Sequence, residues 1–219
     1  MGALYAQASG NSNQINWNLF KINKDIYFNF PMISLREPKS SGKRLHQLLE
    51  DFFGKKRIEN LPIHFGLSIT DVQTGNTQSV ENGVLAESLS ATLALPPIFE
   101  SWKGSDQEQF SSGAVTSPAP LETARNLGGT YFVLIDVLGD NSGNKSADRF
   151  QKAFQPIRNL LRLQRKEFNF VIPVKAGQLP FDDFSRQGDY LAAGVRAADQ
   201  YVPELKANWE KIREGKPNP

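Results

Sequence analysis

The chain has 219 residues, of which 39% are hydrophobic and 11% aromatic, which is enough for one globular domain with a sizeable core. Its net charge of +2 includes no long basic run, so charge gives no case for a nucleic-acid partner. The absence of cysteine excludes a disulfide framework and thiolate metal sites, and no apolar run reaches the roughly 18 residues of a membrane span.

The N-terminal part gives few structural signals. Met1–Ala8 (MGALYAQA) is expected to be helical, and Ser9–Asn18 is rich in Ser, Asn, Gln and Gly, which is typical of a loop. Trp17–Met32 is rich in aromatic residues but has only weak alternation, so it receives no assignment. We expect its aromatic side chains to pack in the interior, with contact to lipid as the alternative. No basic stretch followed by an apolar block suggests a signal peptide here.

A helix is predicted over Ser40–Phe53, because its large apolar residues recur at intervals of three and four along one face. These residues are Leu45, Leu48, Leu49, Phe52 and Phe53. Ser41 is expected to cap the start of this helix and Gly54 its end. The run Lys55–Arg57 then places positive charge where a helix C-terminus favours it. A cationic surface for anionic lipid is the alternative interpretation of these three residues.

The central stretch combines a strand pattern with a helix pattern. Apolar Ile63, Phe65, Leu67 and Ile69 alternate with polar or small residues, which predicts a half-buried strand. Thr74-Gly75 supplies a turn, so Thr77–Val80 can return as the second strand of a hairpin. Val84–Leu93 has helical spacing, and the helix is expected to stop before Pro96-Pro97. Tyr131–Leu138 is almost continuously apolar, as expected of a strand covered on both faces.

The C-terminal third predicts a strand–helix–strand unit followed by a long helix. A helix over Ser146–Leu163, kinked or split by Pro156, connects the apolar strand above to a second strand over Phe168–Val174. Such a crossover makes the two strands parallel. Phe181–Ile212 is expected to be mostly helical, with a new segment starting at Pro203. Residues 1–214 then form one domain, and the tail 215–219 is expected to be disordered.

Three segments of this chain resemble the patatin-like phospholipase family in their order and spacing. They are ITDVQTG (69–75), LALPPIF (93–99) and SGAVTSPAPLETARNLGG (112–129), the last followed by the apolar strand. The resemblance implies an α/β domain with a mixed, mainly parallel sheet covered by helices. It also implies hydrolysis of acyl esters of phospholipids and other lipids without a metal or cofactor, with a lipid or membrane surface as partner. A cytoplasmic or peripheral membrane location is expected.

Catalysis in this family uses a nucleophilic serine in a Gly-x-Ser-x-Gly elbow and an aspartate in an Asp-Gly-Gly or Asp-Gly-Ala motif. The elbow motif occurs nowhere in this chain, and Gly66-Leu67-Ser68 lacks the second glycine. Ser112-Gly113 occupies the aspartate-glycine position, so the dyad aspartate is replaced by serine. Asp71 matches a family aspartate that is more often structural, and Asp106 lies outside the motif. Met1–Ala8 resembles the middle of the helix after the elbow, so the first strand, elbow and oxyanion loop are expected to be missing.

These substitutions leave two classes of function open. The first is a fragment of a patatin-like lipid acyl hydrolase, inactive alone because nucleophile, oxyanion loop and dyad aspartate are absent. A protein partner that supplies or covers the missing N-terminal segment belongs to this hypothesis. The second is a non-catalytic, lipid- or protein-binding pseudoenzyme. Loss of one member of a catalytic unit removes most of the rate, so whether the chain is an enzyme stays open.

Two further patterns are weaker. The loop Gly139–Ser146 has part of the phosphate-binding pattern Gly-x-x-x-x-Gly-Lys-Ser, but Asn144 replaces the second glycine. A plain loop between strand and helix is expected, with phosphate binding as a remote alternative. His46 and His64 have no ligand spacing, so we expect no metal site.

Overall fold

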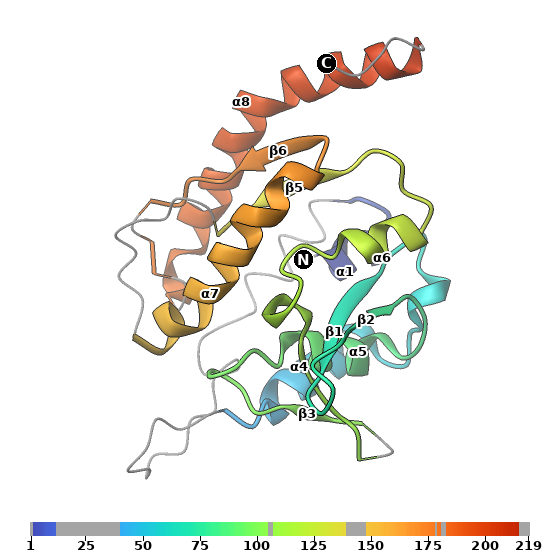
Figure 1. Ribbon diagram of the computed structural model, residues 1–219, viewed down its shortest axis with the longest axis vertical. Helices are drawn as coiled ribbons and strands as arrows, with labels where there is room; N and C mark the ends of the chain where they lie inside the picture. Colours follow the sequence, from blue (N-terminus) through green and yellow to red (C-terminus); the bar gives the residue numbers. More distant parts are fainter. Residues whose placement is uncertain are drawn as a thin grey trace.

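The computed structural model describes residues 2–11, 40–104, 107–138, 148–177, 179–180 and 183–214. Its described strands form one four-stranded and one two-stranded sheet. Figure 1 shows the larger sheet with helices α4 (Lys43–Phe53) and α5 (Leu85–Leu93) in one part of the molecule. The smaller sheet lies in the other part with α7 (Asp148–Gln164) and α8 (Gln187–Arg213). The expected α/β class is confirmed at this level.

The four-stranded sheet has the order β2-β1-β4-β3, and all three of its strand pairs are antiparallel. Its strands are β1 (Leu67–Asp71), β2 (Thr77–Val80), β3 (Trp102–Lys103) and β4 (Gln109–Ser112). The predicted β1–β2 hairpin and its turn are confirmed. The expectation of a mainly parallel sheet is not confirmed in this part of the chain. Short connections join β1 to β2 and β3 to β4, and such connections make neighbouring strands antiparallel.

Strand β1 is buried on both faces. It begins at Leu67 instead of Ile63, and Leu67 and Ile69 are buried as the alternation predicts. Ser68 and Thr70 on the opposite face are buried as well, so the prediction of a half-buried strand was wrong. The reason is tertiary, because the turn that follows β4 packs against this polar face.

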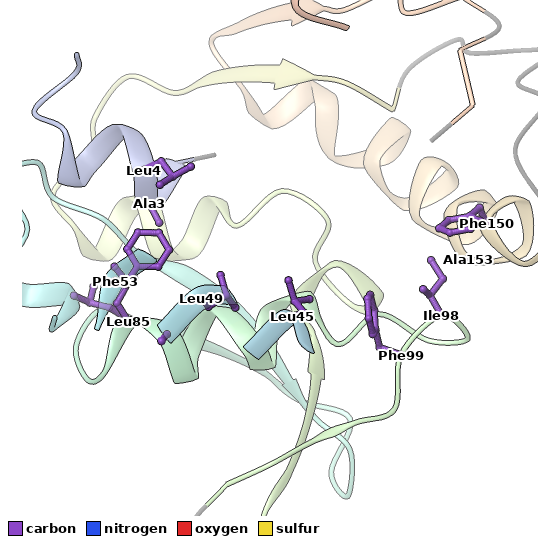
Figure 2. Close-up of a cluster of buried hydrophobic side chains, with 12 residues drawn as sticks. Ala3, Leu4, Leu45, Leu49, Phe53, Leu85, Ile98, Phe99, Phe150 and Ala153 are labelled. Atoms are coloured by element: carbon purple, nitrogen blue, oxygen red, sulfur yellow. The ribbon is translucent and has the colours of Figure 1, made fainter. Parts of the chain in front are cut away.

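The main core lies where α1 (Gly2–Gln7), α4 and α5 meet. Figure 2 shows this cluster running from Ala3 and Leu4 of α1 to Phe150 and Ala153 of α7. Leu85, at the start of α5, is fully buried within the same cluster.

The caps of α4 differ in part from expectation. The N-cap residue is Gly42, at a φ of 70° and without a side-chain hydrogen bond, so Ser41 is not the cap. Glycine adopts this left-handed conformation without a steric penalty. Gly54 caps the C-terminus as predicted, and its N–H donates to the Glu50 carbonyl.

The two-stranded sheet is the predicted parallel pair, formed by β5 (Val133–Asp136) and β6 (Phe170–Pro173). Phe170 and Ile172 of β6 pack against α8. Val133 and Ile135 lie opposite them in register, and therefore on the same face, yet 37% and 63% of their areas are exposed. The expectation of a strand covered on both faces was wrong for β5. Helix α8 covers the β6 half of this face and leaves the β5 half open.

The expectation of a new segment at Pro203 was wrong, and of the two alternatives for Pro156, a kinked or a split helix, the split does not occur. Helix α7 continues through Pro156, and α8 continues through Pro203, where a new segment was expected. Tertiary packing on both sides of each proline holds the helix together. Ala153 and Ile157 are buried around the first proline, and Ala197 and Leu205 pack in one cluster around the second. The ribbon of α8 changes direction along its length (Figure 1), as expected where proline removes a helical hydrogen bond.

The end of α7 connects the two sheets through two adjacent residues. Gln164 accepts a hydrogen bond from the Ala119 N–H at 3.2 Å and donates one to Ser117 Oγ at 3.3 Å, in the segment after β4. Arg165, directly after the helix, pairs with Asp136 at the end of β5, with 2.6 Å between Nη2 and Oδ2. Asp136 is only 2% exposed, and its Oδ1 also accepts from the Leu138 N–H.

Among the described residues, none of the helices is both long and apolar enough to cross a bilayer. The division into a domain over 1–214 and a tail stays a prediction. Trp17–Met32 and the tail 215–219 lie outside the described residues.

Substituting Leu85 tests the core. Leu85→Ala should lower the free energy of unfolding by about 2–5 kcal/mol, because the cavity left by a fully buried leucine collapses only partly. Leu163→Ala on α7 is the matched control. That leucine is 67% exposed, so its change should stay within about 0.5 kcal/mol. Urea unfolding followed by circular dichroism measures both, and similar losses in the two variants would contradict this core.

Candidate functional site

Ser112 is the last residue of β4. It lies opposite Ile69 of β1 and is 6% exposed. Its backbone N–H donates to the Ala94 carbonyl at 3.0 Å, and its carbonyl accepts from Thr70 Oγ1 at 3.1 Å. The Ser112 hydroxyl accepts from the Ala114 N–H at 3.3 Å and so caps the 3₁₀ turn Gly113–Val115. Strand and turn together fix this side chain in one place.

Gly113 makes the closest approach in this region. A Cβ atom built on Gly113 would lie 2.1 Å from Ser68 Oγ and 2.5 Å from the Ser68 carbonyl carbon and oxygen. Real Cβ atoms do not approach backbone this closely, so only glycine fits without displacing β1. Glycine at this position therefore has a steric reason that is independent of catalysis.

A chain of three threonine hydroxyls lies next to Ser112, and we call it the hydroxyl cluster. Its members are Thr70 of β1, Thr77 of β2 and Thr116, which follows the 3₁₀ turn. Thr116 Oγ1 is 2.9 Å from Thr70 Oγ1 and 2.6 Å from Thr77 Oγ1. With Thr70 donating to the Ser112 carbonyl, Thr116 donates to Thr70 and Thr77 donates to Thr116. The cluster orients the turn but contains no group that can take up a proton near pH 7.

Asp71 has a structural role. Its Oδ1 accepts from the Gln73 N–H at 2.8 Å and from the Thr74 N–H at 3.0 Å, which stabilises the hairpin turn. These contacts support the expectation that Asp71 is a structural residue. Asp106 lies outside the described residues, as does the loop Gly139–Ser146.

The sequence did not indicate a contact between α4 and α5 that joins a histidine and a serine. His46 Nδ1 is 2.8 Å from Ser90 Oγ, and His46 Nε2 is 3.6 Å from Glu50 Oε1. The Ser90 hydroxyl also lies 2.8 Å from the Ala86 carbonyl one turn earlier. When the single Ser90 proton is donated to that carbonyl, His46 must donate its Nδ1 proton to Ser90.

The residue types of this arrangement resemble a catalytic triad, but a substrate could not reach the Ser90 hydroxyl. Ser90 is 6% exposed, and the Trp102 ring lies 4.6 Å from the His46 ring. We interpret the contact as a polar link between two packed helices. His46 and Ser90 are 44 positions apart, and no local pattern signals a contact over that distance. His64 is exposed and precedes β1 instead of lying within the strand.

Metal chemistry finds no support in the described part of the chain, where no three His, Cys, Asp or Glu side chains lie close enough to hold an ion. No protein-family model matches this chain. The assignment of Ser112 and Gly113 to a catalytic motif therefore depends on the resemblance of the segments and stays a prediction.

The steric role of Gly113 is testable with two glycine-to-alanine variants. Gly113→Ala should lower the free energy of unfolding by about 1–3 kcal/mol, because its methyl group overlaps the Ser68 backbone. Gly194→Ala, within α8 and with no atom within 4 Å of its built Cβ, should raise it by up to about 1 kcal/mol. Chemical denaturation would measure both, and a neutral Gly113→Ala would show that the turn after β4 does not lie so close to β1.

Proposed function

We propose that this chain forms the Ser112-bearing part of a patatin-like lipid acyl hydrolase domain and that it does not hydrolyse esters by itself. The observation that carries the proposal is the position of the SGAVTSPAP segment. Its first residue is buried at the end of a strand, and Gly113 lies in contact with the central strand β1. Such a turn can hold one side chain in a fixed position and orientation, as a catalytic base requires.

The residue present at that position cannot act as the base. Hydrolysis by a serine enzyme needs a nucleophile, a group that accepts its proton, and donors for the oxyanion. The Ser112 hydroxyl is neutral near pH 7, and its one hydrogen-bond partner among the described residues is the Ala114 N–H. A carboxylate in its place could accept the proton of an incoming serine. The chain therefore has the strand end and turn that would position the dyad base, but not the carboxylate that would accept the proton.

The exposed apolar side chains on one face of β5 support the presence of a further segment beside this strand. Parallel strands are normally covered on both faces, yet Ile135 is 63% exposed and β5 lies at the edge of its two-stranded sheet. We infer that a further segment, from the same polypeptide or from a protein partner, packs over this face of β5 and adds a parallel strand at its free edge. That segment would also supply the nucleophile and the oxyanion donors. The smaller sheet would then be part of the mainly parallel sheet that the resemblance implies.

A non-catalytic role is the second candidate, and Ser112 favours it. A substitution at the base position within an otherwise intact turn is what a pseudoenzyme would have, with lipid or protein binding as its remaining activity. A lipid or membrane surface as partner and a cytoplasmic or peripheral membrane location belong to both candidates.

Ester turnover in four proteins tests the assignment of Ser112. They are the chain itself, its Ser112→Asp variant, and both of these extended or complemented with a Gly-x-Ser-x-Gly segment and its oxyanion loop. We expect activity on a short-chain chromogenic ester only in the complemented Ser112→Asp protein, because nucleophile and base act as one unit. Labelling by a fluorophosphonate should follow the same order.

Ser111→Asp in the complemented protein is the control, because Ser111 is the adjacent residue of β4 and is equally buried. It should give no activity. Equal turnover with and without Ser112→Asp would show that Ser112 is not the base position. Stoichiometric serine labelling with turnover in the chain itself would contradict the inactive state.

A further inference from the structure

A pocket with a cavity volume of about 410 Å³, which Ser112 does not line, lies between the end of α1 and the segment that connects α4 to β1. Its polar lining consists of Gln7, Lys55, Lys56, Arg57 and Asn60, and Leu61 and Pro62 add an apolar wall. Among the described residues, no carboxylate lines it. Its volume lies within the range of about 300–1,000 Å³ that is typical of small-molecule sites.

The pocket carries excess positive charge. Lys55 and Lys56 are exposed and form no ion pair with any described residue. Arg57 is held by Glu59, with 2.5 Å between Nε and Oε1, and Glu59 Oε2 accepts from the Gly83 N–H at 2.9 Å. Hydrogen bonds from the Glu59 backbone N–H and from Arg57 lower the pKa of that carboxyl. Glu59 therefore stays ionised and offsets one of three positive charges.

The segment that carries these cations is fixed before any ligand arrives. The Lys56 carbonyl accepts from the Leu85 N–H at 2.9 Å, and the Ile58 N–H donates to the Gly83 carbonyl at 2.9 Å. Ile58 is 2% exposed and is anchored in the main core. A fixed backbone lowers the entropic cost of placing charges around a bound anion.

Gln7 adds an acceptor whose hydrogen-bonding needs are not met. Its Oε1 is buried and has no hydrogen-bond partner among the described residues. A buried acceptor without a partner has a free-energy cost, and rotation of the Gln7 side chain toward a ligand hydroxyl in the pocket would remove that cost. The C-terminus of α4 could by itself favour Lys55 and Lys56, but that effect does not account for Gln7.

We infer that this pocket binds a phosphate monoester that also carries a hydroxyl group. The ammonium groups of Lys55 and Lys56 and the outer nitrogens of Arg57 donate to the phosphate oxygens. The Gln7 side chain turns toward the pocket so that its Oε1 accepts from the ligand hydroxyl, and the ligand's carbon skeleton packs on Leu61 and Pro62. This binding needs neither Ser112 nor an added segment, so it is independent of hydrolase activity.

Calorimetric titration of the full chain with glycerol 3-phosphate, inorganic phosphate and glycerol tests the site. We expect glycerol 3-phosphate to bind most tightly and glycerol not to bind, with affinity falling as salt rises. The double variant Lys55→Ala/Lys56→Ala should bind at least about tenfold more weakly, since each charged hydrogen bond contributes on that order. Gln7→Leu should reduce the preference for glycerol 3-phosphate over inorganic phosphate.

Lys43→Ala/Lys166→Ala is the control, because it removes the same net charge at two lysines that do not line the pocket. It should keep wild-type affinity. Equal weakening of binding in both double variants would overturn the inference. So would a folded wild-type chain that binds neither glycerol 3-phosphate nor the lipid vesicles described next.

Vesicles distinguish a soluble ligand from a lipid headgroup. The lipid probe is lysophosphatidate, whose headgroup is a phosphate monoester with a free glycerol hydroxyl, carried in phosphatidylcholine vesicles. Sedimentation with these vesicles, against vesicles of phosphatidylcholine alone, would show the headgroup source if binding is lost in Lys55→Ala/Lys56→Ala and competed by glycerol 3-phosphate. Soluble binding without vesicle binding would identify a free phosphate monoester. If the chain binds vesicles equally well with and without Lys55→Ala/Lys56→Ala and does not bind glycerol 3-phosphate, the proposed site in this pocket is contradicted.

Discussion

The close approach of Gly113 to Ser68 is the constraint on which the polar half of this structure depends. Because Gly113 has no Cβ, the turn after β4 can lie directly on β1. At that distance Thr70 reaches the Ser112 carbonyl and Thr116 reaches Thr70. A larger residue would separate strand and turn, and these hydrogen bonds would be lost with the contact. One missing methyl group thus positions the candidate site.

The end of α7 positions the two sheets relative to each other, as Gly113 positions the turn at the candidate site. Gln164 hydrogen-bonds the segment after β4, and Arg165 pairs with the buried Asp136 at the end of β5. Two consecutive side chains therefore relate the antiparallel sheet to the parallel pair. Removal of Arg165 would leave a buried carboxylate with less compensation, which is a costly state. The position of β5 relative to Ser112 thus depends on contacts at this helix end, together with the packing of Phe150 and Ala153 of α7 in the main core.

Local signals in the sequence predicted the elements that local chemistry determines. Alternation and a Thr-Gly turn predicted the β1–β2 hairpin, and Gly54 marked the end of α4. The wrong predictions concern residues whose burial and contacts depend on residues far away in the sequence. Burial of Thr70 depends on a turn some 40 residues later, and His46 meets Ser90 across two helices. The polarity of Ser68 predicted solvent, whereas a glycine 45 positions away covers it. For the site, the resemblance singled out Ser112, but no pattern in the sequence indicated the surrounding hydroxyls.

The continuous course of α8 through Pro203 has a geometric consequence for the sheet beneath it. Proline gives no N–H to the Asp199 carbonyl, so the helix can bend at this turn at little further cost. Sheets twist, and a straight rod lies along a twisted surface only over a short length. Ala197 before Pro203 and Leu205 after it both pack against the β6 side, and Trp209 meets the Tyr131 ring. The proline thus lets one helix follow the curvature of the surface it covers.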